Sequence, residues 1–239
     1  MTTSSNSTFK LSSQEVAALA APQLPARFLW EFLADGRTPA RAITDETLHV
    51  FMPALEGPGT IYELGAGGDY YKKFRSAGQP YLTSNLSSGC DTVLDMTRLD
   101  LADNSVDALL SVFALEHLFD FQAVFDEHYR VLKPGGRFIV IAPFQYYYHA
   151  APDDYFRFSS SALDQLVARF DVLARHPIGG RGVLFAEFLH EKKVLGSSRG
   201  WLARLLMRFA ALPFLACSLK ARDSRFALGF IYVCEKRHA

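Results

Sequence analysis

Two patterns of hydrophobic positions divide the chain near residue 55. Before this point, apolar residues recur at helical spacing in short stretches. Prolines that break helices separate these stretches, at Pro22, Pro25, Pro39 and Pro53. From Thr60 onward, short apolar runs alternate with amphipathic stretches. This alternation predicts an α/β domain in which helices cover both faces of a parallel sheet.

The clearest expected strand is GRFIVIAP at residues 136–143, because a near-continuous apolar run is typical of a strand buried on both faces. The preceding Lys133-Pro134-Gly135 ends a helix and turns the chain into this strand. A last strand is expected at ALGFIYVC, residues 227–234. The other strands are expected at TIYEL, PYLTS, TVLD, SVDALLSVF and FDVLARH.

The pattern predicts an N-terminal tail and helices over residues 1–55 and an α/β domain over residues 56–239. Ser12, with Glu15 three residues later, is typical of the capping box that begins a helix. Residues 179–224 interrupt the alternation and predict an amphipathic helical insertion before the last strand. The uncharged start of the chain does not have the basic and apolar regions of a signal peptide.

Charge and cysteine content exclude several classes of function. The 239 residues carry 25 Lys and Arg against 25 Asp and Glu, and this neutral balance argues against a nucleic-acid partner. The 3 cysteines form no CxxC pair, which indicates reduced thiols in a cytoplasmic protein. Histidine and cysteine form no cluster along the sequence, so no metal site is expected.

A glycine turn follows the first expected strand in IYELGAGGDYY. The dinucleotide fingerprint G-x-G-x-x-G fails because Tyr70 stands where its third glycine would be. The phosphate-binding P-loop pattern fails as well, because Lys72 and Lys73 lack its second glycine and its hydroxyl. Glu63, two positions before the first glycine, favours a ligand that carries a positive charge, such as an amino group. A purely structural turn is the alternative.

Further motifs follow this turn in order: SNLSS, LDMTRLDLADNSVDALLSVFALEHL and RVLKPGGRFIVIAP. Together they resemble the class I methyltransferases that depend on S-adenosylmethionine, especially the small-molecule branch that includes ubiquinone-biosynthesis-like enzymes. The resemblance covers residues 60–143. It implies a Rossmann-like sheet of seven mostly parallel strands with an antiparallel last strand. It also implies that the N-terminal helices form a lid over the cofactor.

The resemblance further implies which residues hold S-adenosylmethionine. The methionine part would lie on Glu63, Gly65, Ala66 and Gly67. The ribose would meet Asn85, and the adenine and the sulfonium side would meet Leu86, Asp95, Met96 and Phe113. Two positions depart from the family pattern: Asp69 replaces a glycine, and Asn85 replaces the usual acidic residue. These departures leave open a binding module without turnover.

Two histidines are candidates for the base that removes a proton from a hydroxyl acceptor. His117 lies in LEHL after the fourth expected strand, where a packing or capping role is the alternative. His149 lies in FQYYYHAAPDDYFRFS, after the strand at residues 136–143. Ligands bind at the carboxyl ends of such strands. In the same loop, Asp154 and Arg157 are expected either to pair and tie the loop down or to contact the acceptor.

These features predict methyl transfer to a hydroxyl of a small sugar-like or amphiphilic metabolite. N- or C-methylation of a small molecule is the alternative chemistry. Residues 201–219 combine an apolar arc with basic residues, which fits a helix on a membrane surface, on its own domain or on a homodimer partner. The resulting location is the cytoplasm, with peripheral contact at the inner face of the membrane as one of these readings.

Overall fold

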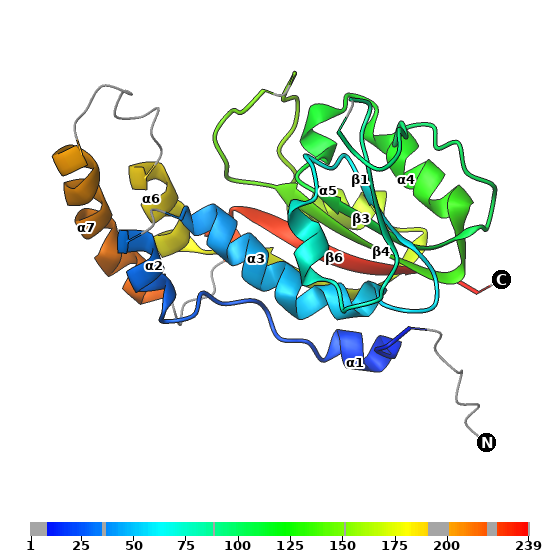
Figure 1. The fold of residues 1–239 in the computed structure, drawn as a ribbon, viewed down its shortest axis with the longest axis horizontal. Helices are drawn as coiled ribbons and strands as arrows, with labels where there is room; N and C mark the ends of the chain where they lie inside the picture. Colours follow the sequence, from blue (N-terminus) through cyan, green and yellow to red (C-terminus); the bar gives the residue numbers. More distant parts are fainter. Residues whose placement is uncertain are drawn as a thin grey trace.

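The computed structural model describes residues 9–34, 37–87, 89–150, 152–190, 201–218 and 224–238. Within them, six strands form one sheet in the order β2-β1-β3-β4-β6-β5, with helices on both faces (Figure 1). The strands are β1 (Ile61–Leu64), β2 (Tyr81–Ser84), β3 (Val106–Val112), β4 (Leu132–Pro143), β5 (Phe170–Ile178) and β6 (Gly229–Lys236). The expected Rossmann-like α/β class is therefore confirmed.

Strands β2, β1, β3 and β4 pair in parallel, and β6 runs antiparallel to both β4 and β5. The antiparallel last strand is thus confirmed. The parallel register places Leu64 of β1 beside Ser84 of β2 and Ser111 of β3. The three chain segments that follow these strands therefore leave the sheet at the same edge, where a doubly wound fold binds its ligands.

The expected count of seven strands is wrong for the described residues. The run TVLD makes only an isolated parallel bridge, between Thr92 and Ser84. Val93 is 65% exposed, so this segment lacks the buried face that stabilises a strand. Asp91 instead accepts hydrogen bonds from the backbone and hydroxyl of Thr83, which hold the segment against the end of β2.

The α-helices are α1 (Ser13–Ala17), α2 (Phe28–Ala34), α3 (Pro39–Phe51), α4 (Phe121–Val131), α5 (Ser160–Leu166), α6 (Arg181–His190) and α7 (Trp201–Ser218). Short 3-10 helices are η1 (Met52–Leu55), η2 (Tyr70–Phe74), η3 (Leu115–His117) and η4 (Ser224–Phe226). The capping box of Ser12 and Glu15 is present at α1.

The glycine turn leads into only a five-residue 3-10 helix, η2. Its aromatic side chains are held by α3: the hydroxyl of Tyr70 donates to Asp45, and Arg41 donates to the hydroxyl of Tyr71. The short helix lets both rings reach α3, so the turn is joined to the N-terminal segment.

Alternate residues of the strands build a core on each face of the sheet. Ala108, Leu110 and Ile139 pack with the N-terminal helices in one cluster. Leu109 and Phe138 face the other way and pack with residues of α4 and α5. The segment 9–55 is therefore part of the main core, and its role as a lid stays a prediction.

Helices α2, α6 and α7 group at one end of the molecule (Figure 1). Helices α6 and α7 pack closely, because a Cβ on Gly182 would lie 2.0 Å from the carbonyl oxygen of Phe214. Both helices fall within residues 179–224, where the sequence predicts an insertion.

Candidate active site

The glycine turn after β1 is a tight backbone structure with one open side. Gly65 has φ +72°, and a Cβ there would lie 2.6 Å from the Cβ of Ala114 and 3.7 Å from the sulfur of Met96. Gly68 has φ +120°, which also favours glycine. A Cβ on Gly67 would meet no atom within 4 Å. The turn thus packs on Ala114 and is open at Gly67, where a ligand could approach the backbone.

Main-chain and amide hydrogen bonds hold this turn to the end of β2. The amide of Ala66 donates to the carbonyl of Ser84 over 2.9 Å. The side-chain amide of Asn85 donates to the carbonyl of Ala66 over 2.8 Å, and its oxygen accepts from the backbone of Leu86. Asn85 therefore braces the turn through its amide nitrogen, which gives this departure from the family pattern a structural reason.

Glu63 is buried beneath the turn. Its carboxylate accepts a 2.6 Å hydrogen bond from the hydroxyl of Tyr81. Burial raises the pKa of Glu63 to about 7, although the Tyr81 hydrogen bond opposes this shift. A cation that binds beside a buried carboxylate of this kind stabilises its ionised form, because the cation offsets the free-energy cost of burying the charge.

The remaining predicted cofactor residues lie at two depths. Met96 is buried beside Gly65, whereas Leu86 is 64% exposed. Asp95 is half-buried, and its Oδ1 accepts from the backbone and hydroxyl of Thr97. The structure thus brings Met96 to the turn and holds the Asp95 carboxylate in a local turn of its own.

Phe113 has the left-handed φ of +50° directly after β3. For a bulky residue this conformation costs about 1–3 kcal/mol, and such strain concentrates at functional sites. The amide of Phe113 donates to Ile141, and its ring stacks on Tyr146 at 6.2 Å between centroids. The resulting sharp turn delivers Ala114 to the glycine turn and η3 to the loop that follows β4.

The loop at residues 144–159 is held by one charged pair. Arg157 donates to the carbonyls of Tyr146 and Tyr147, over 3.1 and 2.8 Å, and to Oδ2 of Asp154 over 2.6 Å. The Arg157 side chain holds the pKa of Asp154 at about 2, well below its usual range. Of the two roles expected for this pair, the structure supports the one that ties down the loop.

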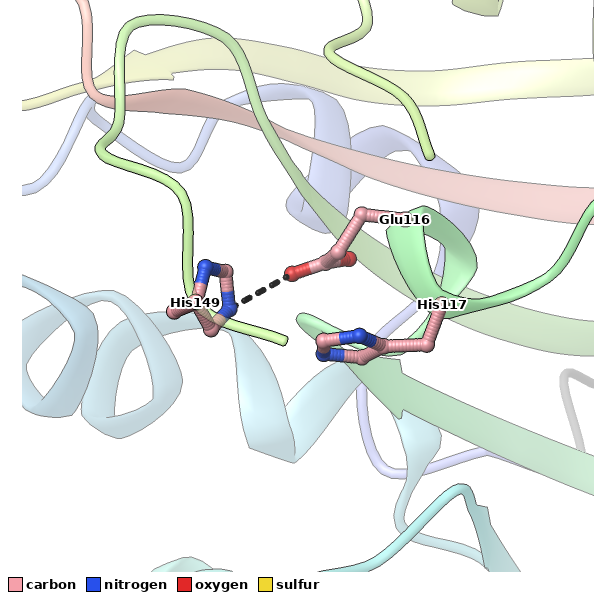
Figure 2. Close-up of side chains that lie close together, drawn as sticks. All are labelled: Glu116, His117 and His149. Atoms are coloured by element: carbon pink, nitrogen blue, oxygen red, sulfur yellow. Dashed lines mark ion pairs between the residues drawn. The ribbon is translucent and has the colours of Figure 1, made fainter. Parts of the chain in front are cut away.

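The two predicted histidines meet around Glu116, which the sequence analysis did not single out (Figure 2). Glu116 and His117 come from η3, and His149 comes from the loop after β4. Nε2 of His149 lies 3.5 Å from Oε1 of Glu116, and the two imidazole rings are 5.1 Å apart. One potential ligand atom of each residue lies within 4.8 Å of the other two. This group is called the Glu-His-His cluster below.

Backbone and carboxylate oxygens orient both imidazoles. Nδ1 of His117 lies 2.6 Å from the carbonyl oxygen of Asp153. Nδ1 of His149 lies 3.2 Å from the carbonyl of Tyr147 and 3.3 Å from Oδ2 of Asp154. A carbonyl oxygen can only accept, so each Nδ1 carries a proton. In a neutral ring, Nε2 then has the free lone pair.

Glu116 is fully buried, and neither of its carboxylate oxygens has a hydrogen-bond partner among the described residues. Its nearness raises the pKa of His149 above the ordinary value, while burial acts in the opposite direction. A buried carboxylate without hydrogen bonds is costly unless a positive charge accompanies it. The cluster is therefore a site for a proton or for another cation.

Sequence reasoning missed the role of Glu116 and expected no metal site. His149 belongs to a segment separate from Glu116 and His117, so the group has no spacing signature. The available signal was the location of both segments after neighbouring parallel strands. The described residues therefore contain a candidate metal group that the sequence analysis did not anticipate.

Comparison with known proteins agrees with this geometry. Residues 67–140 match a family model described as a methyltransferase domain. A segment of 51 residues is 43% identical to demethylmenaquinone methyltransferase from Mycobacterium marinum. This segment is 21% of this chain, and it spans only 22% of the relative's length.

Solved structures extend the likeness to most of the fold. The [4+2]-cyclase SpnF has a TM-score of 0.58 at 15% identity, over 97% of this chain and 98% of its own. A geranyl diphosphate C-methyltransferase from Streptomyces coelicolor has a TM-score of 0.56 at 12% identity, over 95% of each chain. A 1,6-didemethyltoxoflavin-N1-methyltransferase from Burkholderia thailandensis has a TM-score of 0.53 at 15% identity, over 89% of this chain and 87% of its own. Residues 67–140 therefore match a methyltransferase domain, and the chain has the α/β fold of S-adenosylmethionine-dependent methyltransferases.

Proposed function

We propose that this protein transfers the methyl group of S-adenosylmethionine to a hydroxyl of a small sugar-like or amphiphilic molecule. The observation that carries the proposal is the contact between two sites along one segment. Ala114 packs on Gly65 of the glycine turn, and Glu116 and His117 follow within three residues. A donor on the turn and an acceptor at the Glu-His-His cluster would therefore be neighbours.

The residues at the turn fit the donor. S-adenosylmethionine supplies a methyl group on a sulfonium, which is already a good leaving group. The buried carboxylate of Glu63 would meet the amino group of S-adenosylmethionine, and the open side at Gly67 would admit the methionine backbone. Leu86 and Met96 offer apolar surface to the adenine ring. The geranyl diphosphate C-methyltransferase was solved with S-adenosylhomocysteine, which supports the same type of ligand here.

The residues at the loop fit a polar acceptor with a flat face. Phe113, Tyr146 and Tyr147 form a stack, with centroid distances of 6.2 and 4.2 Å. Such rings pack well against a sugar or an aromatic ring. The cluster beside them contains the groups that can withdraw a hydroxyl proton, a step worth about 10²–10⁴-fold in rate. Alignment of donor and acceptor supplies the rest.

Three alternative functions would each give a different result in an activity assay. N- or C-methylation would use the same donor site. The didemethyltoxoflavin N1-methyltransferase and the geranyl diphosphate C-methyltransferase are similar structures whose names state these chemistries. A binding module would hold the donor without turnover. A different reaction on this fold is represented by the cyclase SpnF. All four readings share the turn, so the acceptor side decides among them.

The test is a screen for S-adenosylhomocysteine release with hydroxylated quinones, glycolipids and sugar nucleotides, followed by mass analysis of the product. We expect an O-methyl product whose formation falls by at least about 100-fold in Glu116→Gln. Lys133→Gln is the control, because Lys133 pairs with Asp107 away from the cluster. Donor binding without release on any acceptor would favour the module, and an N- or C-methyl product would overturn the hydroxyl assignment.

We further propose that an amphiphilic acceptor is met at a membrane surface through α7. Among the described residues, no helix is long and apolar enough to cross a membrane. Leu206, Phe209 and Phe214 of α7 are 60%, 52% and 42% exposed. Ala211 and Leu215 face the core instead. The side chains of residues 201–204, and residue 219, lie outside the described residues.

Flotation with anionic vesicles tests this attachment. Wild-type protein is expected to float, and Leu206→Asp with Phe209→Asp should stay in the dense fraction, because the apolar area that drives interfacial binding is lost. Val93→Asp is the control, since Val93 is equally exposed beyond β2. Wild-type protein that does not float, and sediments as a dimer that the same double variant dissociates, would assign the surface to a second copy instead.

A further inference from the structure

The Glu-His-His cluster brings together one carboxylate and two imidazole Nε2 atoms that a single ligand could bridge. Within the part of the chain that the structure describes, Glu116 has no hydrogen bond to either carboxylate oxygen. His117 and His149 each use Nδ1 on a carbonyl oxygen, which leaves Nε2 for another ligand. We propose that Glu116, His117 and His149 bind one divalent transition-metal ion, of which Zn²⁺ is the representative.

The hydrogen bonds around the imidazoles favour this ion. Histidines that bind a metal generally donate their second ring N–H to a carbonyl or a carboxylate, which fixes the tautomer and the ring orientation. Asp153 supplies that oxygen for His117, and Tyr147 and Asp154 supply it for His149. Asp154 is in turn held by Arg157, so the support extends into the loop.

The charge of Glu116 gives the second argument. Among the described residues, Glu116 has one ion-pair partner, a protonated His149. Its Nε2 lies 3.5 Å from Oε1, which is too long for a strong charged hydrogen bond. That pair would still leave Oε2 and the Nε2 of His117 unused. A divalent ion would satisfy the carboxylate and both rings at once, and its charge would offset the burial of Glu116.

The distances require a closure of at most about 1.5 Å. Ligand atoms bound tetrahedrally at about 2.0–2.2 Å from one ion lie about 3.3–3.6 Å apart. The three potential ligand atoms here lie within 4.8 Å of one another. His149 is half-buried on a loop, so rotation of its side chain can supply this closure.

Two imidazoles and one carboxylate suit Zn²⁺ or Fe²⁺ better than Mg²⁺ or Ca²⁺, which prefer oxygen ligands. Three protein ligands also leave a coordination position open, as in catalytic metal sites. The ion's role rests on the proposed function. The acceptor hydroxyl, acidified by the ion, would release its proton to water. Its oxygen would then form the new O–CH₃ bond as the S–CH₃ bond breaks, leaving S-adenosylhomocysteine.

The experiment measures metal binding by itself, without donor or acceptor. Full-length protein stripped with a chelator is titrated with Zn²⁺ by calorimetry, and Co²⁺ absorption reports the ligand set. We expect one ion per chain and at least about 100-fold weaker binding in each of Glu116→Gln, His117→Gln and His149→Gln. His49→Gln is the matched control, because His49 is an exposed histidine on α3.

Thermal unfolding separates loss of the site from loss of the fold. Zn²⁺ should raise the melting temperature of wild type and His49→Gln, because a ligand that binds only the folded state stabilises it. It should not raise that of Glu116→Gln, which must melt cooperatively in chelator to count as folded. Wild-type protein that binds no Zn²⁺, or variants that bind it as wild type does, would overturn the proposal. Zn²⁺ binding without methyl transfer would overturn only the proposed function.

Discussion

The glycine turn and the acceptor loop are built by different means. The turn is held mainly by its backbone, through glycines with positive φ, main-chain hydrogen bonds and close packing on Ala114. The loop is held by charged side chains: Arg157 donates to three backbone carbonyls and to one carboxylate, and Glu116 lies buried beside histidines. A site built from the backbone tolerates few substitutions of its own residues but tolerates changes in the residues around it. A site made by buried charges depends on each partner.

The strongest test of the backbone side is Gly65→Ala. The new Cβ would lie 2.6 Å from Ala114, at a φ of +72° that alanine disfavours. The turn would shift to relieve overpacking and backbone strain of about 3 kcal/mol. Because the donor needs the unshifted turn, S-adenosylmethionine affinity should fall by roughly 100-fold in calorimetry. Gly67→Ala is the matched control, because its Cβ meets no atom within 4 Å. Equal losses in both variants would contradict the assigned packing role of Gly65.

The corresponding test of the side-chain side is Arg157→Met. This change removes the donor to Asp154 and to three carbonyls while keeping the aliphatic stem. Charged hydrogen bonds of this kind contribute about 1.5–3 kcal/mol, so the free energy of unfolding should fall by about 2 kcal/mol in urea.

Donor affinity in Arg157→Met should stay within about twofold of wild type, because the turn does not contact this pair. Arg169→Met is the control, since its ion pair with Asp126 is more than half exposed and such pairs contribute little. A large loss of donor affinity in Arg157→Met would show that the two regions are coupled rather than separate.

The next largest expected effect is a pH dependence of donor affinity that comes from Glu63 beneath the turn. The pKa of Glu63 is about 7, raised by burial, and its ionised form is the one that attracts the donor's amino group. As pH falls through 7, Glu63 takes up a proton and the donor should bind more weakly. The expected loss between pH 7.5 and pH 6 is just under tenfold. Calorimetry at several pH values measures it.

Glu63→Gln provides the reference for this pH dependence. The amide cannot ionise, so donor binding should be weak at both pH values and nearly flat between them. A wild-type slope that survives in Glu63→Gln would assign the titration to another group.

The smallest expected effect concerns Asn85. If its amide braces the turn, Asn85→Asp loses the hydrogen bond donated to Ala66, and donor affinity should fall by about fivefold, or about 1 kcal/mol. If Asn85 instead serves the ribose, the charged acceptor of the variant should tighten binding. Donor titration distinguishes the two signs. Cys90→Ser is a nearby control, because the Cys90 thiol also lies by the Ala66 carbonyl.

Much of the fold could be predicted because its signals are local. The run GRFIVIAP became the long strand β4, and the apolar end of the chain became the antiparallel β6. The run TVLD failed as a strand, although its residues are similar in type. Whether a short apolar run forms a strand depends on burial by distant elements, and Val93 is not covered.

The sequence by itself determined the parallel sheet, the glycine turn and the class of donor. The sheet and the turn rest on hydrophobic periodicity and on glycines whose backbone conformation few other residues adopt, whereas the class of donor rests on the resemblance of the ordered motifs to class I methyltransferases. Only the tertiary structure decided that Asn85 braces the turn, that η2 is short, and that Glu116 joins His117 and His149. Those features depend on which side chains meet when distant segments pack, and no local spacing in the chain encodes that meeting.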